Sequence, residues 1–167
     1  MISGVLDITT TEWCDELVGG VFAGGPKRLE AAAKAGIPQV VSVGALDMVN
    51  FGPPDTVPPQ FKDRKFYQHN PTVTLMRTTV DENTKLGEVI GGKLSKSTGP
   101  CVLFLPLKGV SMIDAEGQPF HGPEEDNALF EALRASCGDA VRIMERERHI
   151  NDQEFALEMA KELERLL

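Results

Sequence analysis

The side chains best suited to chemistry in this sequence stand in short loops directly after apolar runs. The first set, Thr10, Thr11 and Glu12, follows the apolar run at 2–8 and stands at the start of a predicted helix. Hydroxyl groups and free backbone N–H groups at the start of a helix can bind an anion. The same residues can also serve only as a helix cap, because threonine is a common capping residue. Both interpretations stay open at this point.

A second set lies in the turn GGPKR, which contains Gly24, Gly25 and Arg28. The turn separates a short apolar run from a predicted helix, a position at which glycine-rich loops bind phosphate groups. The sequence contains neither GxGxxG nor GxxxxGK[ST], so the standard nucleotide-binding motifs are absent. Arg28 is expected in the first helical turn, where the helix dipole disfavours a cation, and an anionic ligand would offset this cost. The alternative is a tight turn that needs glycine only for its backbone conformation.

Histidine is the side chain most suited to proton transfer at physiological pH, and the sequence contains three. His69 precedes an extended Asn-Pro step, and we take it as the candidate general base, with Asp47 or Asp114 in support. His121 and His149 are interpreted as surface or structural residues. A structural role is also the alternative for His69. No two histidines have the spacing of a zinc site, so no metal site is predicted.

Further polar residues follow other apolar runs and are expected to orient a ligand. This set consists of Asn50, Asn70, Arg77, Thr78 and Ser111. In an open α/β sheet, ligands bind beyond the carboxyl ends of the strands, so these loops would meet at one edge of a parallel sheet. Ser111 does not lie in a GxSxG motif, which argues against a hydrolase with a catalytic triad.

The elements that must position these residues follow from the hydrophobic pattern. Apolar runs predict strands at 2–8, 39–44, 66–67, 73–76, 101–105 and 140–144. The run CVLFL at 101–105 is typical of a strand that is buried on both faces. Because predicted helices separate the strands, parallel crossovers are favoured over hairpins. We predict an α/β protein, a three-layer α/β/α sandwich of Rossmann-like type with a mostly parallel sheet.

Capping signals and prolines predict the boundaries of these elements. Helices are predicted at 10–18 and 27–35, after Asp81, from Pro123 and after Asn151. The pairs Thr9 with Glu12 and Asn151 with Glu154 have the spacing of capping boxes. The segment 45–50 is predicted as a loop or a short helix. The four prolines within 51–60 predict an extended loop.

The composition is that of one globular domain of 167 residues, of which 41% are hydrophobic and 25% charged. With 17 basic and 25 acidic residues, the net charge of −8 disfavours binding to nucleic acid or to anionic membranes. No apolar run is long enough for a membrane helix. The start, MISGVLDITTTEW, lacks the pattern of a signal peptide. Three separated cysteines without a CxxC pair indicate a reducing cytoplasm.

Four long segments of the sequence resemble one protein family. They span residues 7–52, 69–79, 106–134 and 149–156, and they include HNPTVTLMRTT and HINDQEFA. The family is the largely uncharacterised bacterial, fungal and plant family typified by the tomato mosaic virus resistance protein, an inhibitor of viral RNA replication. The resemblance covers nearly the whole chain.

The resemblance implies a longer protein of two Rossmann-like lobes in tandem. It also implies that residues 1–167 form the second of these lobes. It associates ATP with the preceding lobe, which this sequence lacks, so ATP is expected only through that lobe. The family offers no agreed set of catalytic residues. The site residues named above therefore rest on the loop argument alone.

Three functions are compatible with these observations. We favour a lobe that binds a small anionic metabolite or nucleotide in a cleft shared with the preceding lobe. The second is an enzyme of hydrolase-like chemistry with His69 as general base. The third is an interaction module that dimerises through its amphipathic helices and has no small ligand. A homodimer is expected, and neither nucleic acid nor a membrane is an expected partner.

Overall fold

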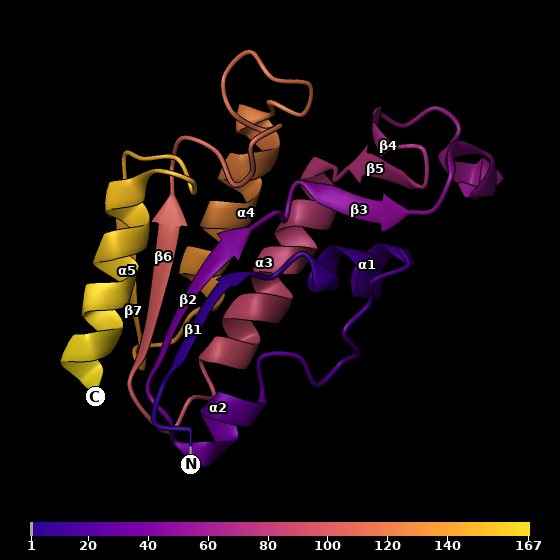
Figure 1. Cartoon of the computed structure of the whole chain (residues 1–167). Coiled ribbons are helices and arrows are strands. Elements are labelled where there is room, and N and C mark those ends of the chain that lie inside the picture. Colours follow the sequence, from indigo (N-terminus) through magenta and orange to yellow (C-terminus); the bar gives the residue numbers. More distant parts are fainter. Residues whose placement is uncertain (1) are drawn as a thin grey trace.

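A four-stranded parallel sheet forms the centre of the molecule (Figure 1). The computed structural model describes residues 2–167. The strands lie in the order β1-β2-β6-β7 and span, respectively, Val5–Thr9, Gln39–Gly44, Cys101–Pro106 and Val141–Arg146. Each neighbouring pair is parallel. The carboxyl ends of the four strands therefore lie at one edge of the sheet.

β2 and β6 are the central strands, and every residue in both is buried. Val40 pairs with Val102, and Val41 pairs with Leu103. Val41 and Leu103 belong to the larger hydrophobic core, whereas Val40 and Val102 belong to a smaller core on the other face. A strand buried on both faces needs a continuous apolar run, which explains why the sequence predicted β6.

Helices cover both faces of this sheet (Figure 1). The helices α1, α2, α3 and α4 lie on one side and span Glu12–Val18, Ala31–Ala35, Val80–Leu94 and Pro123–Ser136. α5 (Gln153–Leu166) packs on the other side, where Phe155 contacts Phe104 with ring centroids 5.8 Å apart. The three layers confirm the predicted α/β sandwich of Rossmann-like type. Among residues 2–167, no helix is both long and apolar enough to cross a bilayer.

Two glycines allow α3 and α4 to approach each other closely. A Cβ atom on Gly87 would lie 2.5 Å from the Cβ of Ala132, and one on Gly91 would lie 2.7 Å from the Cβ of Ser136. Real Cβ atoms do not approach this closely, so larger residues at these positions would push the helices apart. The close packing fixes the second half of α4 against α3.

Residues 48–77 form a second sheet, which is antiparallel. Its strands lie in the order β3-β5-β4 and span Met48–Phe51, Val73–Arg77 and Phe66–Asn70. Two single-turn 3₁₀ helices, η1 (Pro54–Thr56) and η2 (Pro59–Phe61), connect β3 to β4.

This second sheet contradicts three predictions made from the sequence. The segment 45–50 is not a helix or plain loop, since it enters β3, and 51–60 contains 3₁₀ turns instead of extended chain. A hairpin also joins β4 to β5, although parallel crossovers were favoured over hairpins. The physical reason is local. The side chain of Asn70 accepts the N–H of Thr72 at 2.9 Å and closes a tight turn, and Phe51 packs on Phe61 with ring centroids 5.6 Å apart.

α3 begins two residues earlier than predicted, because Thr79 and not Asp81 is its N-cap. The hydroxyl of Thr79 accepts the N–H of Glu82 at 3.2 Å, and the carboxylate of Glu82 accepts the N–H of Thr79 at 2.8 Å. This capping box places Thr79 directly after β5 and its flanking polar residues.

The capping boxes predicted at Thr9 and Asn151 do not form. α1 begins after Thr11 and α5 begins after Asp152, and neither of these side chains makes a capping hydrogen bond. Both pairs have the three-residue spacing of a capping box, but α1 begins two residues later, and α5 one residue later, than that spacing implied.

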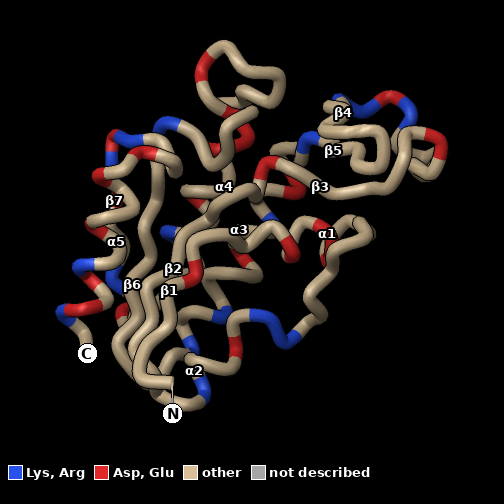
Figure 2. Tube along the Cα trace, in the orientation of Figure 1, with Lys and Arg blue, Asp and Glu red and all other residues tan. Residues whose placement is uncertain are grey.

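Ion pairs connect α5 to β7 along the outer edge of the parallel sheet, where charges of both signs alternate (Figure 2). Two pairs join the strand to the helix: Arg142 with Glu162 and Arg146 with Glu158. Charged side chains on an edge strand discourage pairing with the edge of another sheet. The pairs therefore protect β7, whose outer side has no neighbouring strand in the described sheet.

Candidate functional site

A cavity of about 700 Å³ lies at the carboxyl edge of the parallel sheet, beyond β6 and β7 and beside α4. This edge is where open α/β sheets bind their ligands. The wall combines apolar residues such as Phe130 with several ionisable side chains. The ionisable residues are Lys108, Asp114, Glu116, His121, Asp126, Arg134 and His149.

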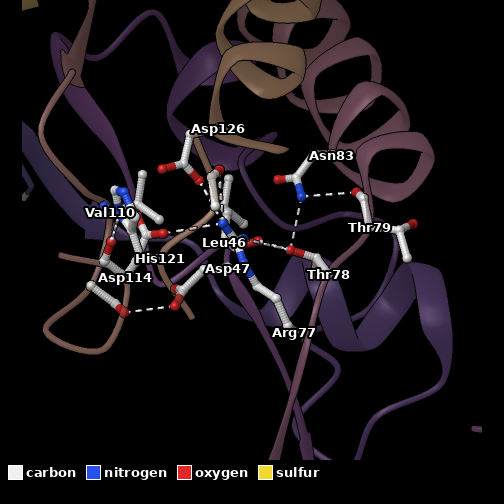
Figure 3. Close-up of polar contacts among 12 residues, drawn as sticks. Leu46, Asp47, Arg77, Thr78, Thr79, Asn83, Val110, Asp114, His121 and Asp126 are labelled. Carbon is white, nitrogen blue, oxygen red and sulfur yellow. Dashed lines mark hydrogen bonds and ion pairs between the residues drawn. The ribbon is translucent and has the colours of Figure 1, made fainter. Parts of the chain in front are cut away.

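Arg77, the last residue of β5, lies at the centre of a buried cluster next to this cavity (Figure 3). Its Nη2 atom donates hydrogen bonds to the carboxylates of Asp114 at 3.1 Å and Asp126 at 2.9 Å, and to the carbonyl of Gly122 at 3.2 Å. The Arg77 side chain is only 5% exposed. The guanidinium thus links β5 to the loop after β6 and to the start of α4.

Burial and like charges shift the protonation of this cluster. Burial raises the pKa of Asp126 to about 8, with the charge of Asp114 adding to the rise and Arg77 opposing it. The fold therefore favours the protonated form of Asp126 more than water does, while the ion pair with Arg77 favours the charged form. Burial lowers the pKa of Arg77, but Asp126, Asp114 and Asp47 outweigh this effect, so the pKa is raised and the guanidinium stays charged.

Asp47 is fully buried in the turn between β2 and β3. The hydroxyl of Ser111 donates to its Oδ2 atom at 2.7 Å, whereas Oδ1 has no hydrogen-bond partner within residues 2–167. Burial raises the pKa of Asp47 to about 6, and the hydrogen bond from Ser111 opposes this rise. Thr78 completes the connection, because its N–H donates to the carbonyl of Asp47 at 3.0 Å and its hydroxyl to the carbonyl of Leu46 at 2.9 Å. These contacts anchor the loop after β6 to the second sheet.

The two histidines of the cavity differ in which ring nitrogen is available. A carbonyl oxygen only accepts, so a ring nitrogen bonded to it must carry the proton. Nδ1 of His121 lies 3.1 Å from the carbonyl of Asp114, which leaves Nε2 as the acceptor of the neutral ring. In His149, Nε2 donates to the carbonyl of Ser111 at 2.8 Å, and Nδ1 accepts the N–H of Asn151 at 3.1 Å. Both nitrogens of His149 are used within the fold, whereas residues 2–167 provide no recorded partner for Nε2 of His121.

The polar residues after β1 form a separate cluster that is closed by its own hydrogen bonds. Thr10 is fully buried, and its hydroxyl donates to the carbonyl of Ser42 at 3.3 Å. The amide of Asn50 donates to the hydroxyl of Thr11 at 3.4 Å and to the carboxylate of Asp15 at 2.9 Å. Burial raises the pKa of Asp15, and the hydrogen bonds from Asn50 oppose the rise. These contacts join α1 to β2 and β3, so they serve the fold.

The segment before α2 differs from its predicted geometry. α2 begins only at Ala31, so Arg28 is not in a first helical turn. The guanidinium of Arg28 donates to both carboxylate oxygens of Asp7, at 2.5 and 2.7 Å, and lies 3.6 Å from Glu12. Its charge is thus compensated within the fold. The prediction that an unfavourable helix position of Arg28 calls for an anion is wrong.

The glycines of this turn have structural roles. Gly25 adopts a φ of 80°, which favours glycine, and its N–H donates to the carboxylate of Glu16 at 3.1 Å. A Cβ on Gly24 would lie 3.2 Å from the Cβ of Glu12. The tight-turn interpretation accounts for both observations.

His69 and Asn70 lie at the far end of the β4–β5 hairpin, where both are exposed. Asn70 pairs with Val73, the first residue of β5, whereas Arg77 ends that strand. A strand of this length separates its two ends by about 13 Å. The structure therefore does not bring His69 to the two aspartates that were expected to support it.

Five of the predicted residues meet at the carboxyl edge: Asp47, Arg77, Thr78, Ser111 and Asp114. The structure adds four that sequence reasoning did not select: Lys108, His121, Asp126 and His149. Their position in the sequence could have identified these residues, because they follow β6 and β7 or lie in the first turn of α4. Within residues 2–167, no group of three or more His, Cys, Asp and Glu side chains is arranged to hold a metal ion.

Comparison with known proteins finds similarity to one family. Residues 1–167 match the C-terminal domain of the uncharacterised protein family UPF0261. A UPF0261 protein of Clostridium tetani is 62% identical over 97% of this chain and 40% of its own length. A UPF0261 protein of Mesorhizobium japonicum is 49% identical over 96% of this chain and 41% of its own length. A ToMV resistance protein of Solanum lycopersicum is 49% identical over 93% of this chain and 21% of its own length. The chain thus spans less than half the length of these relatives.

Proposed function

Because the chain belongs to the UPF0261 family as a C-terminal domain, we propose that it is the ligand-binding lobe of a longer protein. The proposed ligand is a small anionic metabolite or nucleotide. The observation that carries the proposal is the cavity beyond β6 and β7, whose volume of about 700 Å³ falls within the range of small-molecule sites.

The charges around the cavity are compatible with an anion, although the chain as a whole has a net charge of −8. Lys108 contributes an exposed ammonium group, and none of the ion pairs described for residues 2–167 involves it. Asp114 and Asp126 are both paired with Arg77, and the raised pKa of Asp126 further reduces its negative charge near neutral pH. The local charge is therefore less negative than the residue types alone imply.

The rest of the longer protein would supply the opposite wall of the site. Lys108, Glu116 and His121 are exposed in the lobe, so a ligand bound there would remain partly open to solvent. We further propose that any ATP binding involves that remaining part, and that the protein is a cytoplasmic homodimer with neither nucleic acid nor a membrane as partner. These points rest on the family resemblance, on the cysteine pattern and on the charge.

Titration of the protein with phosphate, malonate and AMP, followed by NMR, tests the proposed function. We expect resonances of the cavity residues to shift, and Lys108→Gln to weaken binding about tenfold, as for the loss of one charge-assisted hydrogen bond. Lys62→Gln is the matched control, because Lys62 lines a different cavity among the prolines of residues 54–59. The proposal is wrong if no anion binds, or if both variants weaken binding equally.

A further inference from the structure

We propose that His121 anchors the anion bound in this cavity and that its Nε2 atom takes up one proton when the anion binds. This inference rests on the proposed function. It names His121 as the residue that binds the anion and specifies that one proton is taken up with it. The proton comes from solvent and forms a new N–H bond at Nε2. This N–H then donates to an oxygen of the anion, whose own covalent bonds and charge do not change. The net result is one imidazolium cation and one hydrogen bond to the ligand.

The orientation of the His121 ring is set by a buried scaffold (Figure 3). The ring donates from Nδ1 to the carbonyl of Asp114 at 3.1 Å. The carboxylate of Asp114 is itself fixed by the Nη2 atom of Arg77 at 3.1 Å and the N–H of Val110 at 2.9 Å. Phe120, the residue before His121, is fully buried, and its N–H donates to a loop carbonyl at 2.7 Å. A second group that orients the ring is a common feature of histidines that exchange protons with ligands.

The same loops exclude the other cavity histidine from this role. A proton added to Nδ1 of His149 would break its hydrogen bond with the N–H of Asn151. A Cβ on Gly109 would lie 2.8 Å from the ring of His149, which shows that the ring is packed against the loop after β6. His149 therefore supports the loops, and His121 has the nitrogen that can change its protonation without the loss of a contact.

The charged and titratable residues that line the cavity together with His121 explain why an added proton favours anion binding. They are Lys108, Asp114 and Glu116 from the loop after β6, Asp126 and Arg134 from α4, and His149 from the loop after β7. Arg134 already donates to Glu145 at 2.5 Å, and Asp114 is paired with Arg77. Lys108 is then opposed by Glu116, so an incoming anion meets little net positive charge. Proton uptake by His121 supplies the missing charge next to the ligand.

Sulfate is the probe for this inference, because it remains a dianion near neutral pH and cannot itself supply the proton. Calorimetry in two buffers of different ionisation enthalpy measures the protons taken up per sulfate bound. The informative variant is His121→Asn, whose amide can still donate to the carbonyl of Asp114 but has no ring nitrogen to protonate. His69→Asn on the exposed hairpin is the matched control. His121→Gln serves as a second variant should the asparagine change the fold.

We expect the wild type and His69→Asn to take up protons as sulfate binds. We expect both His121 variants to lose this uptake and to bind sulfate about tenfold more weakly. Equal affinity and equal proton uptake in the His121 variants would overturn the inference and leave the proposed function standing. If the wild type binds neither sulfate nor the anions tested above, both the inference and the proposed function are wrong.

Discussion

A charged side chain buried as deeply as Arg77 requires partners that replace its water, and two segments of the chain supply them. The carboxylates of Asp114 and Asp126 and the carbonyl of Gly122 all accept from the same Nη2 atom. Because these partners come from the loop after β6 and from α4, one guanidinium fixes the geometry of the carboxyl edge. The candidate site therefore depends on an ion pair that no ligand needs to touch.

The free energy of unfolding of the variant Arg77→Met tests how much the folded site depends on this ion pair. The methionine removes the only guanidinium recorded against Asp114 and Asp126 in residues 2–167, and leaves two carboxyl groups in a buried place. We expect a loss of about 3–5 kcal/mol in urea unfolding, as for a buried ion pair that loses one partner. Arg142→Gln is the control, because Arg142 is 47% exposed and such surface pairs contribute about 1 kcal/mol or less. Similar losses in the two variants would contradict the role assigned to Arg77.

The raised pKa of Asp126 predicts how stability changes with pH. In the unfolded chain a carboxyl of this type titrates near pH 4, whereas burial, the charge of Asp114 and the opposing charge of Arg77 give Asp126 a pKa of about 8 in the folded protein. Between these values the folded state holds more protons, so this group makes stability fall as pH rises, by at most about 1.4 kcal/mol per pH unit. Asp47, with a pKa of about 6, acts in the same direction up to that pH.

We therefore expect Asp126→Asn to flatten the decline in the free energy of unfolding between pH 6 and pH 8, as measured by urea titrations at each pH. The asparagine cannot ionise. It therefore removes the proton that the folded state holds and that unfolding releases. Asp139→Asn, at an exposed position before β7, should leave the pH dependence as it is in the wild type. An unchanged slope in Asp126→Asn would show that Asp126 is ionised in the folded protein.

The sequence predicted part of the candidate site for a reason that depends on single residues. Asp47, Ser111 and Asp114 were selected because they follow buried strands, and the sheet does bring them together. His121 was interpreted as a surface or structural residue, because it lies in a loop rich in glycine and proline. The contact of its ring with the carbonyl of Asp114, which leaves Nε2 available, exists only in the folded loop. The prediction that Arg28 marks an anion site was wrong, because the guanidinium is paired with Asp7. This partner lies on a strand distant in sequence, so the local pattern around Arg28 does not reveal it.

At the scale of elements, the hydrophobic pattern predicted the four parallel strands, the start of β4 and most of β5, but it missed β3 and the antiparallel pairing. β2 and β6 are continuous apolar runs, because both of their faces are buried. β3 and β4 are four and five residues long and include polar side chains, so they carry little hydrophobic pattern of their own. They form because they pair with β5, and this pairing is a tertiary contact that a local pattern does not contain.

The contact between α3 and α4 predicts opposite effects on stability for alanine substitutions at two glycines of α3. A methyl group at Gly87 would lie 2.5 Å from the Cβ of Ala132 and 2.8 Å from the backbone carbonyl of Leu129, whereas one at Gly92 would meet nothing within 4 Å. We expect Gly87→Ala to lower the free energy of unfolding by about 1–3 kcal/mol through overpacking. Gly92→Ala should raise it by up to about 1 kcal/mol, because alanine favours the helix.

Urea unfolding of the two variants measures both effects, and NMR shifts at the carboxyl edge report whether the start of α4 moves. A stabilising Gly87→Ala would mean that the helices separate without cost. In that case the close packing would not be what fixes α4 against α3.

At the scale of the whole molecule, several large apolar side chains are exposed on the surface of the lobe. Met112, in the loop that carries Ser111 and Asp114, is 75% exposed, and Phe22, after α1, is 55% exposed. The bacterial relatives compared here are more than twice as long as this chain. Exposed apolar side chains are typical of surfaces that contact another protein or domain, which agrees with the proposal that the rest of a longer chain packs against this lobe.

The longer UPF0261 protein of Clostridium tetani, which is 62% identical over the shared part, shows how the rest of such a protein affects ligand affinity when it is compared with this chain. Under the proposed function, the lobe alone would present one wall of the site, and its exposed Lys108 and His121 would contact a bound anion from one side only. We expect about millimolar affinity, or about 4 kcal/mol, for the tightest anion of the panel. The longer protein should bind the same anion far more tightly, because a second wall excludes water and adds contacts. Calorimetry on both proteins measures the difference. Equal affinities would show that these 167 residues contain the complete site. The remaining part of the longer protein would then need a different role.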